Sequence, residues 1–428
     1  MILTVGSAGS SLSGELTPPG DKSISHRAVI LASLADGQSR IEGLLESEDV
    51  RATINACLQL GVKIVKQDGE LLVDGSGAEG LSEPRRPLDM GNSGTAMRLL
   101  TGVLAAQPFY SELRGDDSLS TRPMRRIVQP LTAMGARIET SESGTPPLHI
   151  SGNPGLKGID YASPVASAQV KSCILLAGLY AEGKTRVTEP RKSRDHTEKM
   201  LPTFGVPVTD DCTVEGGGFL TAAKVRVPGD ISSAAFFMAA ASLIPGSSLT
   251  LNNVGLNKTR DGIIRVLTAM GADLEVIKPR MYGKEMVGDI LIRYRGQLKG
   301  IDIPLQWIPS LIDELPVVMA LAAVSEGTTR IRGAEELRVK ESDRISVMAR
   351  GLESLGVRLK EYRDGMDIEG GGIKGTWVDG AGDHRCAMSF CILGQLLESE
   401  LEIHGCGNID TSYPGFVSDL QNLGGVIK

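Results

Sequence analysis

The apolar and polar positions along the chain follow one pattern that recurs six times. In each copy an amphipathic helix ends at a glycine, and a strand follows that glycine. Glycine just beyond a helix can adopt the left-handed conformation that ends the helix without steric cost. We therefore expect a helix, a glycine and a strand at CLQLGVKIV (57–65), LTAMGARIE (131–139), LPTFGVPVT (201–209), LTAMGADLE (267–275), LESLGVRLK (352–360) and LQNLGGVIK (420–428).

A second pattern precedes each copy and consists of a helix, a turn and a strand. Its alanine-rich helical faces can pack closely, and its turns lead into alternating strands. The six sequences are ILASLADGQSRIEG, LLTGVLAAQPFYSELRG, CILLAGLYAEGKTRVTE, FFMAAASLIPGSSLTLNN, VVMALAAVSEGTTRIRG and FCILGQLLESELEIHG. Helices that alternate with strands along the whole chain predict an α/β protein.

A larger duplication divides the six units into two halves. PGDKSISHRAVILASL begins at Pro19, and PGDISSAAFFMAAASL begins at Pro228. We infer two similar domains with three helix-and-strand units each. The first domain is expected to comprise residues 15–226 and the second residues 227–428 plus 1–14. The N-terminal residues join the second domain because a complete repeat starts only at Pro19.

Composition narrows the class of protein. A chain of 428 residues favours two domains over one, and a net charge of -7 argues against a general nucleic-acid or acidic-membrane surface. The six cysteines form no CxxC pair and the five histidines are scattered, which favours reduced thiols over a zinc site. No secretory signal and no apolar run of about 20 residues is evident. We therefore expect a cytoplasmic protein.

The helix that follows PPGDKSISHR carries charges that the repeated fold does not need. Lys22 and Arg27 have no counterpart in the second half, where DKSISHR becomes DISSAAF. The first backbone N–H groups of a helix lack internal partners and favour an anion. Ser23 or Ser25 could be an ordinary helix cap. The two cations favour a phosphate or carboxylate site instead.

Other buried helices also begin with polar or charged residues. Gly94 lies in the turn GNSGTAMR, which exposes backbone amides, and Arg122 precedes a proline, so its backbone is expected to be extended. ASAQVKS (166–172) places Ser167 and Gln169 where they could cap a helix. The charged segment RKSRDHTEKM (191–200) has the composition of a solvated face, and only its Arg194 is a candidate ligand.

The second half contributes carboxylates as well as cations. Asp313 and Glu314 enter an apolar helix, and KESDR (340–344) and GDHRCAM (382–388) precede two more. Acids at a helix start and a salt-bridge network are the ordinary explanations. If the helix starts of both halves point at each other, however, these charges meet in an interdomain cleft. Such a cleft suits a small substrate with several negative charges, and closing it would expel water.

At these residues the chain resembles the 5-enolpyruvylshikimate-3-phosphate synthase family. PGDKSISHRA, GNSGTAMR, RPM, KESDR and DHRCAM appear in the family's order, and the resemblance covers essentially the whole chain. ASAQVKS and SRDHTEKM resemble the family's second class more than its first. DTSYPGF has no lysine where members of the first class place one for phosphoenolpyruvate. The resemblance implies two inside-out α/β domains of three βαβαββ units each, with the active site between them and with no metal or organic cofactor.

The resemblance also implies the reaction and its residues. The family transfers the enolpyruvyl group of phosphoenolpyruvate to the 5-hydroxyl of shikimate 3-phosphate and releases phosphate. The implied ligands of shikimate 3-phosphate are Lys22, Ser23, Arg27, Ser167, Ala168, Gln169, Arg194, Asp313 and Lys340. Those of phosphoenolpyruvate are Lys22, Gly94, Arg122, Gln169, Arg344 and Arg385. We expect Asp313 to act as the base, Glu341 to protonate the methylene carbon, and Lys22 to assist catalysis.

Two alternatives to this reaction have distinct sequence signatures. UDP-N-acetylglucosamine enolpyruvyl transferase usually has Lys-Asn where this chain has Lys22-Ser23, and commonly a cysteine before the RP motif, whereas residues 110–122 contain none. A non-catalytic repeat scaffold would not need charges that differ between the halves. We also expect a monomer, and the glycine at position 94 predicts sensitivity to the herbicide glyphosate.

Overall fold

The computed structural model describes residues 1–7, 11–77 and 80–428, and these divide into two compact units. Unit 1 comprises Met1–Pro19, Pro228–Arg280 and Met286–Lys428, and unit 2 comprises Gly20–Val227 and Met281–Glu285. Residues 15–19, expected in the first domain, thus lie with unit 1. The reason is that strand β2 (Ser13–Leu16) pairs in parallel with β14 (Ser248–Gly255) of that unit.

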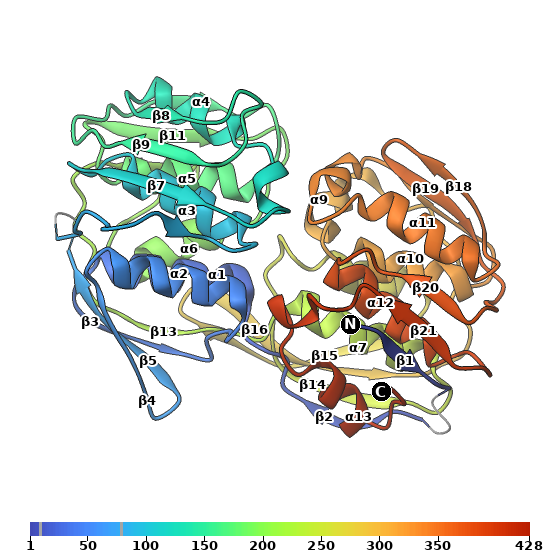
Figure 1. Cartoon of the computed structure of the whole chain (residues 1–428). Helices are drawn as coiled ribbons and strands as arrows, with labels where there is room; N and C mark the ends of the chain where they lie inside the picture. Colours follow the sequence, from blue (N-terminus) through green and yellow to red (C-terminus); the bar gives the residue numbers. More distant parts are fainter. Residues whose placement is uncertain (8–10, 78–79) are drawn as a thin grey trace. The chain divides into compact units, whose positions relative to one another are not determined.

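Unit 2 contains three sheets that are built on one plan. In each, a parallel pair of strands is extended by one or two antiparallel strands. In sheet order the strands are β13 (Lys224–Arg226), β3 (Asp36–Glu42), β5 (Glu70–Ser76) and β4 (Lys63–Gln67); β6 (Leu88–Asp89), β7 (Tyr110–Arg114), β9 (Leu148–Ser151) and β8 (Arg137–Glu139); and β10 (Asp160–Ala162), β11 (Lys184–Thr188) and β12 (Thr213–Glu215). The first of these sheets contains the strands labelled β13, β3, β5 and β4 in Figure 1.

Unit 1 also contains three sheets, and two of them are completed by strands from the N-terminal end of the chain. The blue strands β1 and β2 lie beside strands of the second half in Figure 1. In sheet order the strands are β15 (Asp273–Tyr282), β16 (Glu285–Arg293), β14 and β2; β17 (Thr328–Ile331), β19 (Gly365–Glu369) and β18 (Arg358–Tyr362); and β1 (Leu3–Val5), β21 (Leu401–His404) and β20 (Trp377–Asp379).

Three helices form the interior of each unit, and further helices lie among the strands around them. Both interior sets are buried along nearly their whole length. They are α1 (Lys22–Leu34), α3 (Gly94–Leu104) and α5 (Ala168–Gly178) in unit 2, and α7 (Ile231–Leu243), α10 (Leu315–Val324) and α12 (His384–Gly394) in unit 1. The others are α2 (Glu48–Gln59), α4 (Arg125–Ala133), α6 (His196–Met200), α8 (Gly262–Met270), α9 (Ile308–Leu311), α11 (Arg344–Ser354) and α13 (Phe416–Asn422).

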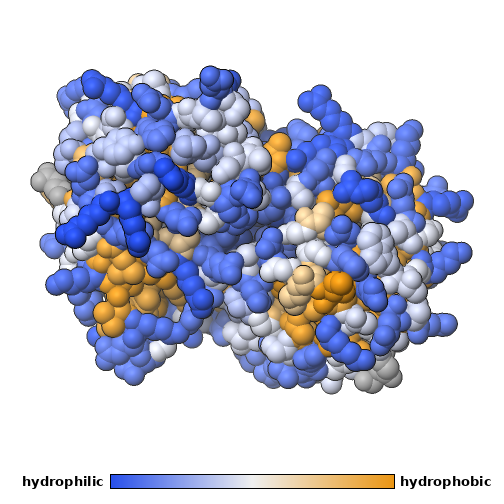
Figure 2. All heavy atoms as spheres, viewed as in Figure 1, coloured by the Kyte–Doolittle hydropathy of each residue, from blue (hydrophilic) through white to orange (hydrophobic). Residues whose placement is uncertain are grey.

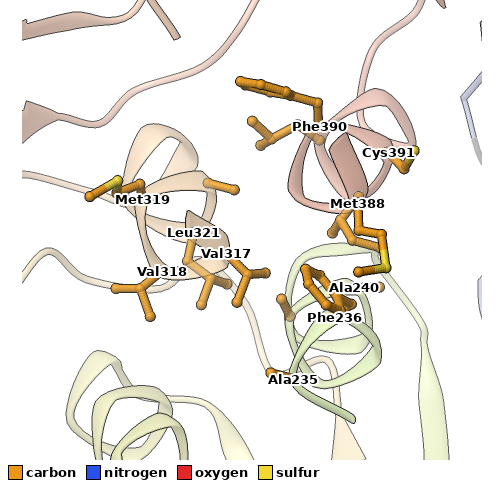
Figure 3. Close-up of a cluster of buried hydrophobic side chains, with 14 of the residues drawn as sticks. Ala235, Phe236, Ala240, Val317, Val318, Met319, Leu321, Met388, Phe390 and Cys391 are labelled. Atoms are coloured by element: carbon orange, nitrogen blue, oxygen red, sulfur yellow. The ribbon is translucent and has the colours of Figure 1, made fainter. Parts of the chain in front are cut away.

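Each unit therefore has its own hydrophobic core, made chiefly by the interior helices. In unit 1, Phe236 of α7, Val317 of α10 and Met388 of α12 belong to one cluster (Figure 3). Hydrophilic residues predominate on the face viewed in Figure 2, where hydrophobic residues form smaller patches. Helices inside and sheets outside confirm the expected inside-out α/β class.

The glycines of the six repeats behave as the pattern predicts. All six have a positive φ, between 78° and 103°, at Gly61, Gly135, Gly205, Gly271, Gly356 and Gly424. A regular strand follows four of them, whereas 206–209 and 425–428 contain no named strand. The second of these segments keeps one bridge, between Val5 and Ile427.

No single described helix is long and apolar enough to cross a membrane. The segments Leu305–Leu311 and Leu315–Val324 are long and apolar enough only when they are taken together, and the chain bends by 118° between them. The second segment, α10, packs against α7 and α12 in the core of unit 1.

Candidate active site

The three interior helices of unit 2 begin with capped first turns. The side chains of Asp21, Ser93 and Ser167 accept hydrogen bonds from the backbone N–H groups of Ile24 (2.9 Å), Ala96 (3.2 Å) and Val170 (3.5 Å). Thus Asp21, rather than Ser23 or Ser25, caps α1, and Ser167 caps α5 as predicted. A capping residue satisfies one of the free N–H groups of the first turn, and the others still favour an anion.

Two of these helix starts are brought together by close packing of α3 and α5. A Cβ atom on Gly102 of α3 would lie 2.2 Å from the carbonyl oxygen of Cys173 in α5, so only glycine allows the two backbones to approach this closely. Gln169, at the start of α5, donates from Nε2 to Thr95 Oγ1 of α3 (2.9 Å) and accepts from Arg98 Nη1 (2.6 Å).

Gly94 lies directly beside two guanidinium groups. A Cβ atom at this position would be 2.9 Å from Arg98 Nη1 and 3.3 Å from Arg122 Nη1. Arg122 has extended backbone dihedrals, as its place before Pro123 predicts, and its Nη2 donates to Asn92 Oδ1 (2.6 Å). Both arginines are almost completely buried. They form a concentrated positive charge around the start of α3.

The two cations of α1 have different environments. Lys22 is half-buried, and its Nζ lies 3.0 Å from Asp49 Oδ2 of α2. Arg27 is buried and donates from Nε to Thr197 Oγ1 (2.7 Å), from Nη1 to the Ser23 carbonyl (2.8 Å) and from Nη2 to Ser172 Oγ (2.6 Å). Burial lowers the pKa of Arg27 to about 10, so it remains charged at neutral pH.

The segment 191–200 is not the solvated face that its composition indicates. Asp195, His196 and Thr197 are buried, and Arg194 is partly buried. The reason is a long-range partner, because His196 Nδ1 lies 2.7 Å from Glu285 Oε1 within unit 2. Arg194 therefore belongs to a fixed segment that also contacts α1 and α5.

In unit 1 the charged residues surround Arg344, whose side chain is 1% exposed. Its Nε lies 2.8 Å from Asp383 Oδ2, its Nη2 2.6 Å from Glu341 Oε2 and its Nη1 3.5 Å from Asp313 Oδ1. Burial alone would lower the pKa of Arg344, but these carboxylates raise it above its ordinary value. Burial opposes ionisation of Asp383 too, and the attraction of Arg344 nevertheless lowers the pKa of Asp383.

The remaining predicted residues of unit 1 gather at Asp313. Lys340 Nζ lies 3.6 Å from Asp313 Oδ1, and Arg385 Nη1 donates to the Asp313 backbone carbonyl (3.1 Å). The start of α10, the segment before α11 and the start of α12 thus meet in one cluster. Its cations could bind an anion, and its carboxylates could exchange protons.

Sequence reasoning did not single out several side chains that hold these groups. Asp49 and Asp383 are the carboxylate partners of Lys22 and Arg344. Lys171 is buried in the otherwise apolar α5. A lysine within an apolar helix was the available signal for Lys171, whereas the partners of the other residues come from distant elements. Among the described residues, no three His, Cys, Asp or Glu side chains are grouped to hold a metal ion.

Comparisons with known proteins agree with the sequence motifs. The chain is 54% identical over 428 residues to the 3-phosphoshikimate 1-carboxyvinyltransferase of Methylococcus capsulatus. This match covers 99% of this chain and 98% of that relative. It is 52% identical over 416 residues to the protein of the same name from Legionella pneumophila strain Corby, covering 96% of each.

Solved structures show the same fold. An EPSP synthase from Acinetobacter baumannii has a TM-score of 0.89 and 46% identity, with 100% of this chain and 99% of that chain covered. The enolpyruvyl transferase NikO from Streptomyces tendae has a TM-score of 0.82 at 17% identity, with 100% of this chain and 98% of that chain covered. At this identity the likeness is one of fold alone. Residues 7–420 match the family EPSP synthase (3-phosphoshikimate 1-carboxyvinyltransferase), and the chain belongs to this family.

Proposed function

We propose that the two charged clusters, one in each unit, bind the two substrates of a single enolpyruvyl transfer. The enzyme is a transferase of the shikimate pathway to aromatic amino acids, and its substrates are phosphoenolpyruvate and shikimate 3-phosphate. Full-length relatives at 52–54% identity favour this reaction over transfer to UDP-N-acetylglucosamine and over a non-catalytic scaffold. The assignment of individual residues, a monomeric state and a cytoplasmic location stay predictions.

Shikimate 3-phosphate is assigned to the starts of α1 and α5. Lys22, Ser23 and Arg27 supply cations and a hydroxyl from α1, while Ser167, Ala168 and Gln169 supply polar groups and backbone N–H from α5. Arg194 adds a cation from the segment before α6. The free N–H groups and the dipole of each helix start stabilise the phosphate further. Asp313 and Lys340 of unit 1 complete the set of ligands.

Phosphoenolpyruvate is assigned to the arginine-rich positions. It carries a carboxylate and a phosphate, and guanidinium groups bind both through paired donors that stay charged. Arg122 beside Gly94 supplies such donors in unit 2, and Arg344 and Arg385 supply them in unit 1. Lys22 and Gln169 are shared with the other substrate, because both substrates must meet where the new bond forms.

The reaction needs three proton transfers: one from the 5-hydroxyl, one to the methylene carbon, and one from the methyl group that this addition forms. Asp313 takes the proton of the 5-hydroxyl as its oxygen attacks the enol carbon, and Glu341 gives a proton to the neighbouring methylene carbon. Loss of phosphate, with return of one proton from the new methyl group to the Glu341 carboxylate, then restores the carbon–carbon double bond and gives the enol ether. Lys22 stabilises the charge of the leaving phosphate. Arg344 contacts both Asp313 and Glu341, so one buried cation orients the two carboxylates.

The test of this function is release of phosphate from phosphoenolpyruvate by the purified protein, with each acceptor supplied in turn. We expect release with shikimate 3-phosphate and none with UDP-N-acetylglucosamine or without an acceptor. Release with the nucleotide sugar alone would overturn the proposed acceptor. Absence of release with either acceptor, from a protein that unfolds cooperatively, would overturn the proposed chemistry.

A further inference from the structure

Lys171 occupies an unfavourable place for a lysine. It lies near the start of α5, at the positive end of the helix dipole, and its side chain is 3% exposed. A buried ammonium group is tolerated only where opposite charges compensate for the lost water. Lys171 Nζ lies 2.7 Å from Glu198 Oε1 and 2.9 Å from Glu189 Oε2. Burial alone would lower the pKa of Lys171, but Glu198 and Glu189 raise it, so the group stays charged.

The first carboxylate, Glu189, connects Lys171 to two segments of the proposed substrate site. Its Oε1 accepts a hydrogen bond from the backbone N–H of Ser167, the residue that caps α5 (2.9 Å). Its Oε2 accepts from the backbone N–H (3.2 Å) and the hydroxyl (2.9 Å) of Ser193. Ser193 directly precedes Arg194 in the chain. The position of this one side chain therefore determines where both segments lie.

The second carboxylate, Glu198, connects Lys171 to α6 and through it to α1. Two adjacent residues of α5 contact two adjacent residues of α6, because Ser172 Oγ lies 2.7 Å from Thr197 Oγ1 beside the Lys171–Glu198 pair. Arg27 of α1 donates to both of these hydroxyls. Its charge is also attracted by Glu198.

We propose that Lys171 is a positioning residue for shikimate 3-phosphate, which holds the segments of Ser167, Arg194 and Arg27 in one arrangement without touching the substrate. The inference rests on the ligand assignment proposed above. The cluster of Lys171, Glu189 and Glu198 carries a net negative charge, because one ammonium group lies between two carboxylates. Without Lys171 the two carboxylates repel each other across the junction of α5, α6 and the segment before Arg194.

Lys171→Met tests this inference, because it keeps the apolar stem and removes the charge. A second variant, Lys171→Met with Glu198→Gln, removes the cross-link and also relieves the repulsion, so that folding is retained. Lys157→Met is the control, since Lys157 is an exposed lysine that pairs with Glu182. Each protein is assayed for phosphate release with varied shikimate 3-phosphate and with varied phosphoenolpyruvate, below its measured melting temperature.

We expect both Lys171 variants to raise KM for shikimate 3-phosphate by about tenfold or more, with a smaller change in KM for phosphoenolpyruvate. The reason is that the displaced side chains are proposed to bind shikimate 3-phosphate. The control should change neither constant. A double variant that melts at a lower temperature but keeps both KM values would overturn the inference, since Lys171 would then be structural only. Ser167→Ala separates the two proposals: if it leaves KM for shikimate 3-phosphate unchanged, the ligand assignment fails and the inference falls with it.

Discussion

Arg344 and Asp383 form an ion pair whose two side chains are almost completely buried, with 2.8 Å between Nε and Oδ2. Asp383 also caps α12, since its Oδ1 accepts from the backbone N–H of Arg385 (2.9 Å), and Arg344 is the first residue of α11. One carboxylate thus fixes the starts of two helices that carry proposed ligands of phosphoenolpyruvate. The attraction between Arg344 and Asp383 also offsets the free-energy cost of removing the two charges from water.

Asp383→Ala should therefore lower the free energy of unfolding by about 3–5 kcal/mol, because it leaves a buried guanidinium group without its best partner. Asp383→Asn should cost less, since its side-chain oxygen can still cap α12. Equilibrium unfolding in urea measures both changes. Asp302→Ala is the matched control: the Asp302–Arg330 pair has the same 2.8 Å separation, but both side chains are mostly exposed, so little change is expected. Equal losses for Asp383→Ala and Asp302→Ala would contradict the argument.

His26 predicts how stability depends on pH. It is fully buried in α1, its Nδ1 lies 2.7 Å from Thr53 Oγ1, and burial, with help from Lys22 and Arg27, lowers its pKa well below 6.5. The folded protein keeps this ring neutral while the unfolded chain takes up a proton below pH 6.5. Stability is therefore lost as the pH falls from 6.5 towards the lowered value, by at most about 1.4 kcal/mol per pH unit from this group.

Urea unfolding on either side of pH 6.5 measures this contribution. A His26→Gln variant lacks the titrating group and should lose less stability on acidification than the original protein does. The comparison uses the difference between the two pH values within each protein, so a general destabilisation by the substitution cancels. Identical losses in the two proteins would show that His26 does not titrate in this range.

The local parts of this architecture could be predicted from sequence, and the long-range pairings could not. A glycine after a helix has a conformational preference of its own, and all six repeat glycines have the expected positive φ. Residues 15–19 lie with unit 1 and not with the unit expected from the repeat, because the partner of β2 is β14, more than half a chain away. The segment around His196 was predicted to be exposed because Glu285, its partner, lies far along the sequence.

The same distinction holds for the site. The motifs predict Lys22, Gly94 and Arg344 as ligands because cations and glycines at helix starts have a local chemical meaning. They do not reveal that Lys22 pairs with Asp49, or that Arg344 contacts three carboxylates, because these partners lie on other elements. Contacts between side chains of distant elements can be assigned only once the fold is known.

Gly94→Ala should weaken the binding of phosphoenolpyruvate more than the binding of shikimate 3-phosphate. The new methyl group would lie 2.9 Å from Arg98 Nη1, so the guanidinium groups beside it must move by a few tenths of an ångström. We expect KM for phosphoenolpyruvate to rise by about tenfold, KM for shikimate 3-phosphate to change less, and inhibition by glyphosate to weaken. Gly407→Ala is the control, because no atom lies within 4 Å of its added methyl group. Steady-state kinetics with each substrate varied would show an equal rise in both constants if Gly94 were not specific to phosphoenolpyruvate.

Asp313→Asn and Glu341→Gln should each lower kcat by about 10²–10⁴-fold, because each removes a proposed proton-transfer group while it keeps the shape of the side chain. Both substitutions also remove a carboxylate partner of Arg344, so a loss of rate alone could come from a disturbed arginine. Asp383→Asn separates the two causes, since it removes the third carboxylate of Arg344 but no proposed acid or base. Phosphate release at saturating substrates, with urea unfolding of the same samples, measures rate and stability together. The assignment holds if Asp313→Asn and Glu341→Gln lose far more turnover than Asp383→Asn at equal folded fractions. It fails if both retain near-normal turnover, or if all three variants lose turnover in proportion to their stability.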